Sequence, residues 1–166
     1  MSAWLRFRLV FIISFISVVL DQLSKVWADR YLTHFAMNSY LSDTVRIGYV
    51  ENHGAFLGLG SGLSEGLRFW IFVVAVGVVL GALLVYMFKS QQQNVYSLVC
   101  LSLIFSGGIS NFYDRAMNNG AVIDFLNIGI GSLRTGIFNI ADVAIMLGVF
   151  MLLFAKTDNG STDKQA

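Results

Sequence analysis

Two aspartates, Asp124 and Asp142, are the residues of this chain whose types and positions best suit chemistry. Asp142 lies inside an apolar stretch that could enter a membrane, and Asp124 lies in the segment just before it. Two carboxyl groups that meet at low dielectric share one proton, because both cannot easily ionise. The ionised group could take a proton from water while its neutral neighbour donates a hydrogen bond to a carbonyl. These are the steps of peptide hydrolysis without a metal.

Each aspartate alone also has a structural interpretation. Asp124 could be a turn or capping residue, and Asp142 could form an ion pair with Arg115 or Arg134. An ionised carboxylate is costly in hydrocarbon and needs a reason to be there. The occurrence of the two aspartates within and just before one apolar stretch therefore favours a functional site.

The composition indicates a membrane protein. Of the 166 residues, 56% are hydrophobic and only 13% are charged, whereas a soluble domain carries about 25% charged residues. The formal net charge of +1 implies no strong attraction to nucleic acid. The single cysteine, Cys100, excludes an intramolecular disulfide, and with only two histidines beside it the usual zinc ligand sets are not expected.

Four apolar stretches are each close to the ~20 residues that cross a bilayer as a helix. They cover about residues 7–27, 67–88, 95–112 and 137–155. The first begins like a cleaved signal peptide, but no small-residue cleavage site follows, so we expect it to be retained. The predicted fold class is an all-α polytopic membrane protein with four transmembrane helices. These form a single domain over residues 1–156, followed by a disordered cytoplasmic tail at 157–166.

Basic residues at the ends of the stretches favour a cytoplasmic location for both termini, although the asymmetry is weak. The two longer connections, about 29–66 and 113–136, would then lie on the opposite side of the membrane. The first contains the alternating stretch Thr44–Val50, which predicts a short strand. Val122–Ile130 is too short to span the membrane and could be a strand or an interfacial segment.

Polar residues cluster at one predicted depth, near the outer ends of three helices. Residues three or four apart share a helix face, and three such pairs occur: Asp21 with Lys25, Asn111 with Arg115, and Asn139 with Asp142. Gly107 and Gly108 precede the second pair by one turn and would let that helix pack closely. We therefore expect these polar groups to meet in one site.

Around these residues the chain resembles the lipoprotein signal peptidases (signal peptidase II), the aspartyl enzymes of the bacterial inner membrane. Any one motif is weak, but five in the family's order, over nearly the whole chain, are specific. The five blocks are Asp21-Gln22-Leu23-Ser24-Lys25, Asn52-His53-Gly54-Ala55-Phe56, Gly107-Gly108-Ile109-Ser110-Asn111 followed by Asp114-Arg115, Val122-Ile123-Asp124-Phe125, and Phe138-Asn139-Ile140-Ala141-Asp142.

The resemblance implies an endopeptidase that removes signal peptides from bacterial prolipoproteins, cutting before a cysteine that carries a diacylglyceryl group. It implies no metal and no cofactor, and catalytic roles for Asp124 and Asp142. Substrate-binding or site-ordering roles would belong to Asn52, Gly54, Asn111, Arg115 and Asn139. Supporting roles would belong to Asp21, Lys25, Gly107 and Gly108.

The resemblance also implies where the protein works. It would be a multi-pass protein of the bacterial inner (cytoplasmic) membrane, with a small periplasmic cradle of strands and loops and an active site toward the periplasmic face. Its partners would be prolipoproteins with a diacylglyceryl-cysteine and membrane lipids. We expect no nucleic acid partner and a monomeric protein.

Two functions from other classes stay open at this point. The main alternative is a small proton-coupled transporter or channel subunit, in which Asp142 and the Asp21–Lys25 pair would relay protons. Against it, the polar groups cluster at one depth rather than lining a path across the membrane. A further alternative is a non-catalytic membrane assembly protein, for which both aspartates would be dispensable.

Overall fold

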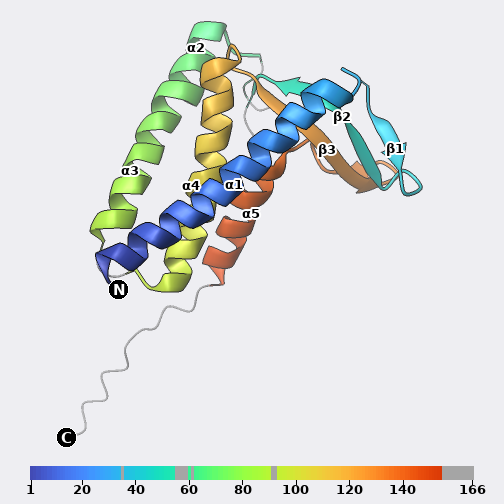
Figure 1. Cartoon of the computed structure of the whole chain (residues 1–166). Coiled ribbons are helices and arrows are strands. Elements are labelled where there is room, and N and C mark those ends of the chain that lie inside the picture. Colours follow the sequence, from blue (N-terminus) through green and yellow to red (C-terminus); the bar gives the residue numbers. More distant parts are fainter. Residues whose placement is uncertain (35, 55–59, 61, 91–92, 155–166) are drawn as a thin grey trace, which may run out of the picture.

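Helices form most of the molecule, and a small sheet caps one end of them. The computed structural model describes residues 1–34, 36–54, 60, 62–90 and 93–154. The predicted tail at 157–166 and two residues of the second motif, Ala55 and Phe56, lie outside these described residues. The N-terminus, the end of α3 and the end of α5 lie at the end of the bundle opposite the sheet (Figure 1).

The first helix, α1, runs from Ala3 to Tyr31 and crosses obliquely over α4 and α5 (Figure 1). The Ser2 hydroxyl caps it by accepting a hydrogen bond from the Leu5 amide at 3.2 Å. Most of its large apolar side chains are exposed, while Asp21 and Lys25 are buried. Soluble proteins show the opposite arrangement, with apolar side chains buried and charged ones exposed. The arrangement of α1 is expected when lipid surrounds a helix and its polar groups meet inside the protein.

The second long helix is continuous from Glu65 to Lys89. It consists of α2 (Glu65–Phe69), a π-helical turn η2 (Trp70–Ala75) and α3 (Val76–Lys89). At the far end, the buried Arg6 side chain of α1 donates hydrogen bonds to the carbonyl oxygens of Met87, at 2.7 Å, and Ser90, at 2.5 Å. Arg6 thus binds the otherwise unpaired carbonyls at the end of α3.

The third and fourth apolar helices are α4 (Val95–Met117) and α5 (Ile140–Leu153), and they pack closely against each other. Gly107 makes this contact possible, because a Cβ there would overlap the carbonyl oxygen of Ala141. The third predicted stretch ended near residue 112, but α4 continues to Met117. It ends where Gly120, at φ +85°, donates its N–H to the Arg115 carbonyl at 2.9 Å.

Among the described residues, three helices are long and apolar enough to cross a membrane: α1, the helix at 65–89, and α4. Helix α5 is apolar but has only 14 residues. At 1.5 Å per residue it is about 21 Å long, shorter than the ~30 Å hydrocarbon core. The several long apolar helices indicate a multi-pass membrane protein, and a small antiparallel sheet is added to them.

Within the described part of the chain, the sheet has four antiparallel strands in the order β1-β2-β3-β4. They are β1 (Asn38–Tyr40), β2 (Val45–Asn52), β3 (Val122–Ile130) and β4 (Leu133–Arg134). The alternating stretch at 44–50 thus lies almost entirely in β2. The stretch at 122–130, for which a strand and an interfacial segment were both open, is the strand β3.

Backbone hydrogen bonds join the sheet to the start of α5. Phe138 donates its N–H to the Leu126 carbonyl at 2.8 Å, and the Leu126 N–H returns to the Phe138 carbonyl at 2.9 Å. This bridge lies one residue before Asn139, the N-cap of α5. Strand β3 and the first turn of α5 are therefore held at a fixed separation.

Candidate active site

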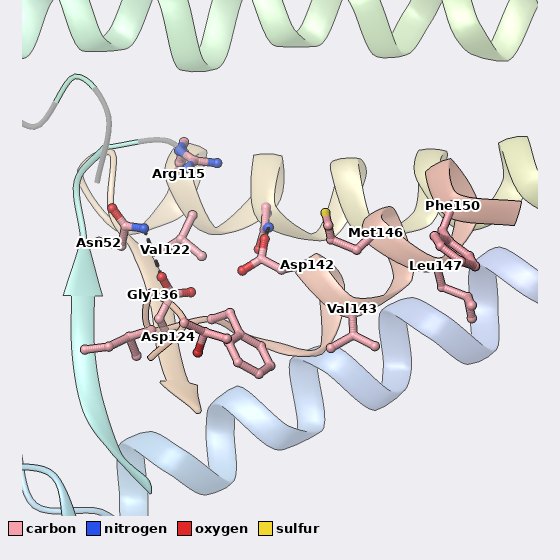
Figure 2. Close-up of a pocket in the computed structure, with 14 residues that line it drawn as sticks. Asn52, Arg115, Val122, Asp124, Gly136, Asp142, Val143, Met146, Leu147 and Phe150 are labelled. Carbon is pink, nitrogen blue, oxygen red and sulfur yellow. Dashed lines mark hydrogen bonds between the residues drawn. The ribbon is translucent and has the colours of Figure 1, made fainter. Parts of the chain in front are cut away.

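Asp124 is the third residue of β3, and it is almost completely buried. Val50 is its pairing partner on β2, and Asn52 is two residues further along that strand, so its side chain is the diagonal neighbour on the same face. Asn52 donates a hydrogen bond from Nδ2 to Asp124 Oδ2 at 2.9 Å, drawn in Figure 2. A turn or capping role for Asp124 is wrong, because the residue is inside a strand.

Asp142 is the third residue of α5 and is part of a capping box with Asn139. Asp142 donates its N–H to Asn139 Oδ1 at 2.9 Å, and Asn139 donates its N–H to Asp142 Oδ2 at 3.2 Å. We expected both residues on one helix face, but Asn139 precedes the helix as its N-cap. The spacing Asn-x-x-Asp was itself the available sequence signal for this cap.

Asn139 also connects the two aspartates. Its fully buried side chain donates from Nδ2 to Asp124 Oδ1 at 2.6 Å, while its backbone N–H binds Asp142. Asn111, on α4, completes the set by donating from Nδ2 to Asp142 Oδ1 at 2.9 Å. Each carboxyl group thus accepts two hydrogen bonds, and one asparagine serves both. The structure brings together the two aspartates that the sequence singled out.

Both carboxyl groups face one cavity of about 490 Å³ (Figure 2). Its polar end is formed by the aspartates with Asn52, Asn111 and Arg115. Its other wall consists of apolar side chains spaced by three or four residues on α5, namely Val143, Met146, Leu147 and Phe150. The cavity therefore offers hydrogen-bonding groups at one end and a hydrocarbon-like surface along the helix.

Burial changes the acidity of the site. It raises the pKa of Asp124 from 3.8 to about 7, and the nearby charge of Asp142 acts in the same direction. The hydrogen bonds from Asn52 and Asn139 favour the ionised form and only partly oppose burial. Near neutral pH, Asp124 can therefore either hold or release a proton.

Arg115 lies at the rim of this polar end. Its Nη2 donates to the carbonyl oxygen of Gly54 at 2.7 Å, and its guanidinium lies over the Phe72 ring at 5.5 Å. Gly54 in turn donates its N–H to Asn52 Oδ1 at 2.9 Å. Among the described residues, Arg115 Nε is buried without a hydrogen-bond partner. Arg115 thus fixes the end of β2 and keeps one donor unused.

The two arginines proposed as ion-pair partners of Asp142 are engaged elsewhere. Arg134 contacts Asp43, at 3.4 Å, and donates to Asn127 Oδ1 at 2.6 Å. Within the part of the chain that the structure describes, neither Arg115 nor Arg134 forms an ion pair with Asp142. The structural interpretation of Asp142 as half of an ion pair is therefore wrong.

A second polar group lies directly behind the site. We call it the Lys25 cluster, and it comprises Asp21, Gln22, Lys25, Ser110 and Asp114. The Lys25 ammonium is 2.7 Å from a carboxylate oxygen of both Asp21 and Asp114. The sequence spacing placed Asp21 and Lys25 on one helix face, and α4 contributes a second carboxylate, that of Asp114.

Three members of the Lys25 cluster, Gln22, Ser110 and Asp114, were not among the predicted site residues. Gln22 donates to Asp114 Oδ1 at 2.8 Å, and Ser110 donates to Asp21 Oδ2 at 2.7 Å. All three stand in the motif blocks quoted above, and the spacing of Ser110 and Asp114, four apart, also placed them on one face of their helix. It could not show which helix they face.

Gly107 and Gly108 have different neighbours on α4. Gly107 faces the start of α5, and Gly108 faces Leu80 of α3. The first allows the approach that brings Asn111 to Asp142, while the second lets α3 pack on α4. Among the described residues, no group of three or more His, Cys, Asp or Glu side chains is arranged to hold a metal ion.

Known proteins share both the sequence and the architecture. A lipoprotein signal peptidase of Streptococcus pyogenes serotype M1 is 33% identical over 145 residues, which are 87% of this chain and 90% of the relative. That of Streptococcus agalactiae serotype V is 29% identical over 144 residues, or 87% and 88%. A solved structure of a bacterial membrane enzyme superposes with a TM-score of 0.78 at 28% identity, covering 95% of this chain and 93% of the other.

A second solved bacterial membrane enzyme gives a TM-score of 0.75 at 27% identity, covering 90% of this chain and 93% of the other. The family model described as signal peptidase (SPase) II, Peptidase_A8, matches residues 13–157. This match includes both aspartates and all the polar residues that surround them. The chain therefore belongs to the signal peptidase II family of aspartic-type peptidases.

Proposed function

We propose that this protein is an aspartyl endopeptidase that removes signal peptides from diacylglyceryl-modified bacterial prolipoproteins, cutting before the lipidated cysteine. The observation that carries the proposal is the pair of carboxyl groups, those of the buried Asp124 and the partly buried Asp142, that face one cavity. They come from different elements and are joined through Asn139. The family membership and the names of the curated relatives support the same reaction.

In the proposed mechanism Asp142 is ionised and Asp124 holds the shared proton. The raised pKa of Asp124, about 7, supports this assignment. Asp142 takes a proton from water, and the water oxygen attacks the scissile carbonyl. Asp124 gives its proton to the carbonyl oxygen, which forms a neutral tetrahedral diol.

The diol then collapses in the second half of the reaction. The carbon–nitrogen bond breaks as Asp142 returns its proton to the leaving nitrogen. Asp124 recovers a proton from a diol hydroxyl, so the resting state is restored. The two carboxyl groups and one water molecule therefore account for every proton that is transferred in the reaction.

The surroundings of the dyad suit a lipidated peptide. The unused Nε of Arg115 can donate to a substrate carbonyl, and the amides of Asn52 and Asn111 border the same space. The apolar wall formed by α5 can accept hydrocarbon. Gly54 and Asn139 order the site through their bonds to Arg115 and the aspartates.

We also propose a topology with four spans, with α5 as the short fourth span, and a monomeric protein in the bacterial inner membrane. Both termini would be cytoplasmic, and the sheet would form a periplasmic cradle. The short α5 would begin below the headgroups, where Asp142 meets a peptide bond held close to its lipid anchor. Residues 1–156 would form one membrane domain followed by the tail at 157–166.

Cleavage of a defined substrate tests the proposal. Purified protein in detergent is incubated with a diacylglyceryl-modified prolipoprotein, and the released signal peptide is quantified. We expect cleavage by wild type and near-complete loss in Asp124→Asn and Asp142→Asn, with Asp29→Asn as the matched control. Asp29 is an exposed aspartate of α1, and its variant should cleave like wild type.

Two results would contradict the proposal. One is normal cleavage by either dyad variant, which would remove that aspartate from the mechanism. The other is absence of cleavage by folded wild type together with proton flux in liposomes, which would favour the transporter alternative. The non-lipidated prolipoprotein serves as the substrate control.

A further inference from the structure

Lys25 makes one contact that charge neutralisation does not require. Lys25 is about 1% exposed, and its ammonium already lies against the carboxylates of Asp21 and Asp114, each at 2.7 Å. Its third hydrogen bond goes to a neutral group, the amide oxygen Oδ1 of Asn111, at 2.8 Å. Asn111 is the residue that donates to Asp142.

The donors around Asn111 determine which way its amide points. A lysine ammonium can only donate hydrogen bonds, so the Asn111 atom facing it must be the oxygen. Asn139 donates from Nδ2 to the same oxygen at 3.1 Å. The Asn111 NH₂ group must then face Asp142 Oδ1, at 2.9 Å. A flipped amide would place its oxygen against a carboxylate and its NH₂ against two donors.

We propose that Lys25 is a positioning residue for peptide cleavage: by fixing the orientation of the Asn111 amide, it aims a hydrogen-bond donor at Asp142. That donor keeps Asp142 as the ionised group that takes a proton from water. The inference rests on the proposed function, because it assigns a role to Asp142 in catalysis. It adds Lys25, which does not itself contact the cavity, to the residues on which turnover depends.

Asp21, the partner of Lys25, acts on the backbone beside the same aspartate. Its Oδ1 accepts a hydrogen bond from the Ala141 N–H at 2.7 Å. This N–H is one of the unpaired donors in the first turn of α5. One face of α1 therefore sets both the backbone next to Asp142 and, through Asn111, the donor to its side chain.

A double-mutant cycle tests whether Lys25 acts through Asn111. Lys25→Met is combined with Asp114→Asn, which removes one charge of each sign and leaves the net charge of the Lys25 cluster unchanged. Losing a hydrogen bond to a charged group should lower kcat by about 10- to 100-fold, with KM within about threefold. Asn111→Leu, of similar size, should lower kcat by a similar factor.

A triple variant combines Lys25→Met, Asp114→Asn and Asn111→Leu. It distinguishes a role of Lys25 through Asn111 from a role that is independent of Asn111. If Lys25 acts through Asn111, the triple variant should have the kcat of Asn111→Leu within about threefold. If the losses multiply, the proposal is overturned. It is also overturned if the Lys25→Met, Asp114→Asn variant unfolds at lower temperature but keeps wild-type kcat per folded molecule, which would be a purely structural role.

A second variant keeps Lys25 and therefore its charge balance. Asn111→Asp still offers an oxygen to the ammonium but faces Asp142 with an oxygen in place of a donor. We expect kcat at neutral pH to fall at least about 100-fold, and near-wild-type kcat would overturn the proposal even if Lys25→Met cannot be folded. Wild type is assayed in parallel, and its failure to cleave the lipidated substrate would instead refute the proposed function.

Discussion

Replacing Asp124 by asparagine should change how the stability of the protein depends on pH. The pKa of this carboxyl rises from 3.8 to about 7 in the folded protein, chiefly through burial. A rise of one unit in pKa corresponds to about 1.4 kcal/mol, so ionising Asp124 in the folded state costs about 4 kcal/mol more than in the unfolded chain. The side chain is about 1% exposed, so solvent screening reduces this cost little.

The raised pKa of Asp124 determines whether stability rises or falls with pH. The protonated carboxyl contributes stability that is fully present below pH 3.8 and is lost as the pH rises to about 7. Asparagine does not titrate, so its contribution stays constant. Between pH 5 and pH 8, wild type should lose about 3 kcal/mol relative to Asp124→Asn. The variant also loses one acceptor for Asn52 or Asn139, a cost that does not vary with pH.

Thermal unfolding in detergent, followed by tryptophan fluorescence at several pH values, measures the effect. For a chain of this size, the difference in Tm between the two proteins should change by roughly 6–12 °C over that pH range. Asp43→Asn is the control, because Arg46 holds the pKa of Asp43 well below its usual range. Its curve should stay parallel to wild type above pH 5. Parallel curves for wild type and Asp124→Asn would refute the reasoning.

Three other substitutions test the packing and the cavity. Gly107→Ala places a methyl group against the Ala141 carbonyl, which should push α5 from α4 and lower both Tm and kcat; an unchanged kcat would contradict the close approach. Arg6→Gln should cost about 1–3 kcal/mol of stability, measured by unfolding, because it leaves the buried carbonyl of Met87 and the partly buried carbonyl of Ser90 without this donor; cleavage by the folded fraction should continue. Met146→Trp narrows the cavity at its apolar wall and should raise KM for lipidated substrate about 10-fold without an equal fall in kcat. An equal rise in KM for a non-lipidated peptide would show a general defect instead.

Sequence patterns predicted the helices well, because lipid exposure produces long apolar runs that need no partner to be recognised. They also placed both aspartates in one site, since the polar pairs recur at matching depth. The ends of the elements were harder to predict. Helix α4 passes the predicted limit at 112 and reaches Met117, because polar residues such as Asn111 and Arg115 lie inside the helix rather than after it.

What the sequence could not provide is the register between elements. Nothing local shows that Asp114 shares Lys25 with Asp21, or that Asn139 reaches across to β3. The pairing of β2 with β3 also shifts between Ile47 and Val50, and this shift decides which side chain lies beside Asp124. Such facts depend on how α1, α4 and the sheet are rotated against one another, and periodicity within one segment carries no information about that rotation.

The bridging position of Asn139 also constrains when this enzyme can become active during biosynthesis. Strand β3 and the first turn of α5 must be in place before Asn139 can contact both acids, and α4 must be in place before Asn139 can contact Asn111. In the proposed mechanism, a polypeptide still emerging from the ribosome that lacks α5 also lacks Asp142, one of the two acids. Under this mechanism, the chain would be inert toward neighbouring membrane proteins, and toward itself, until α5 has been inserted.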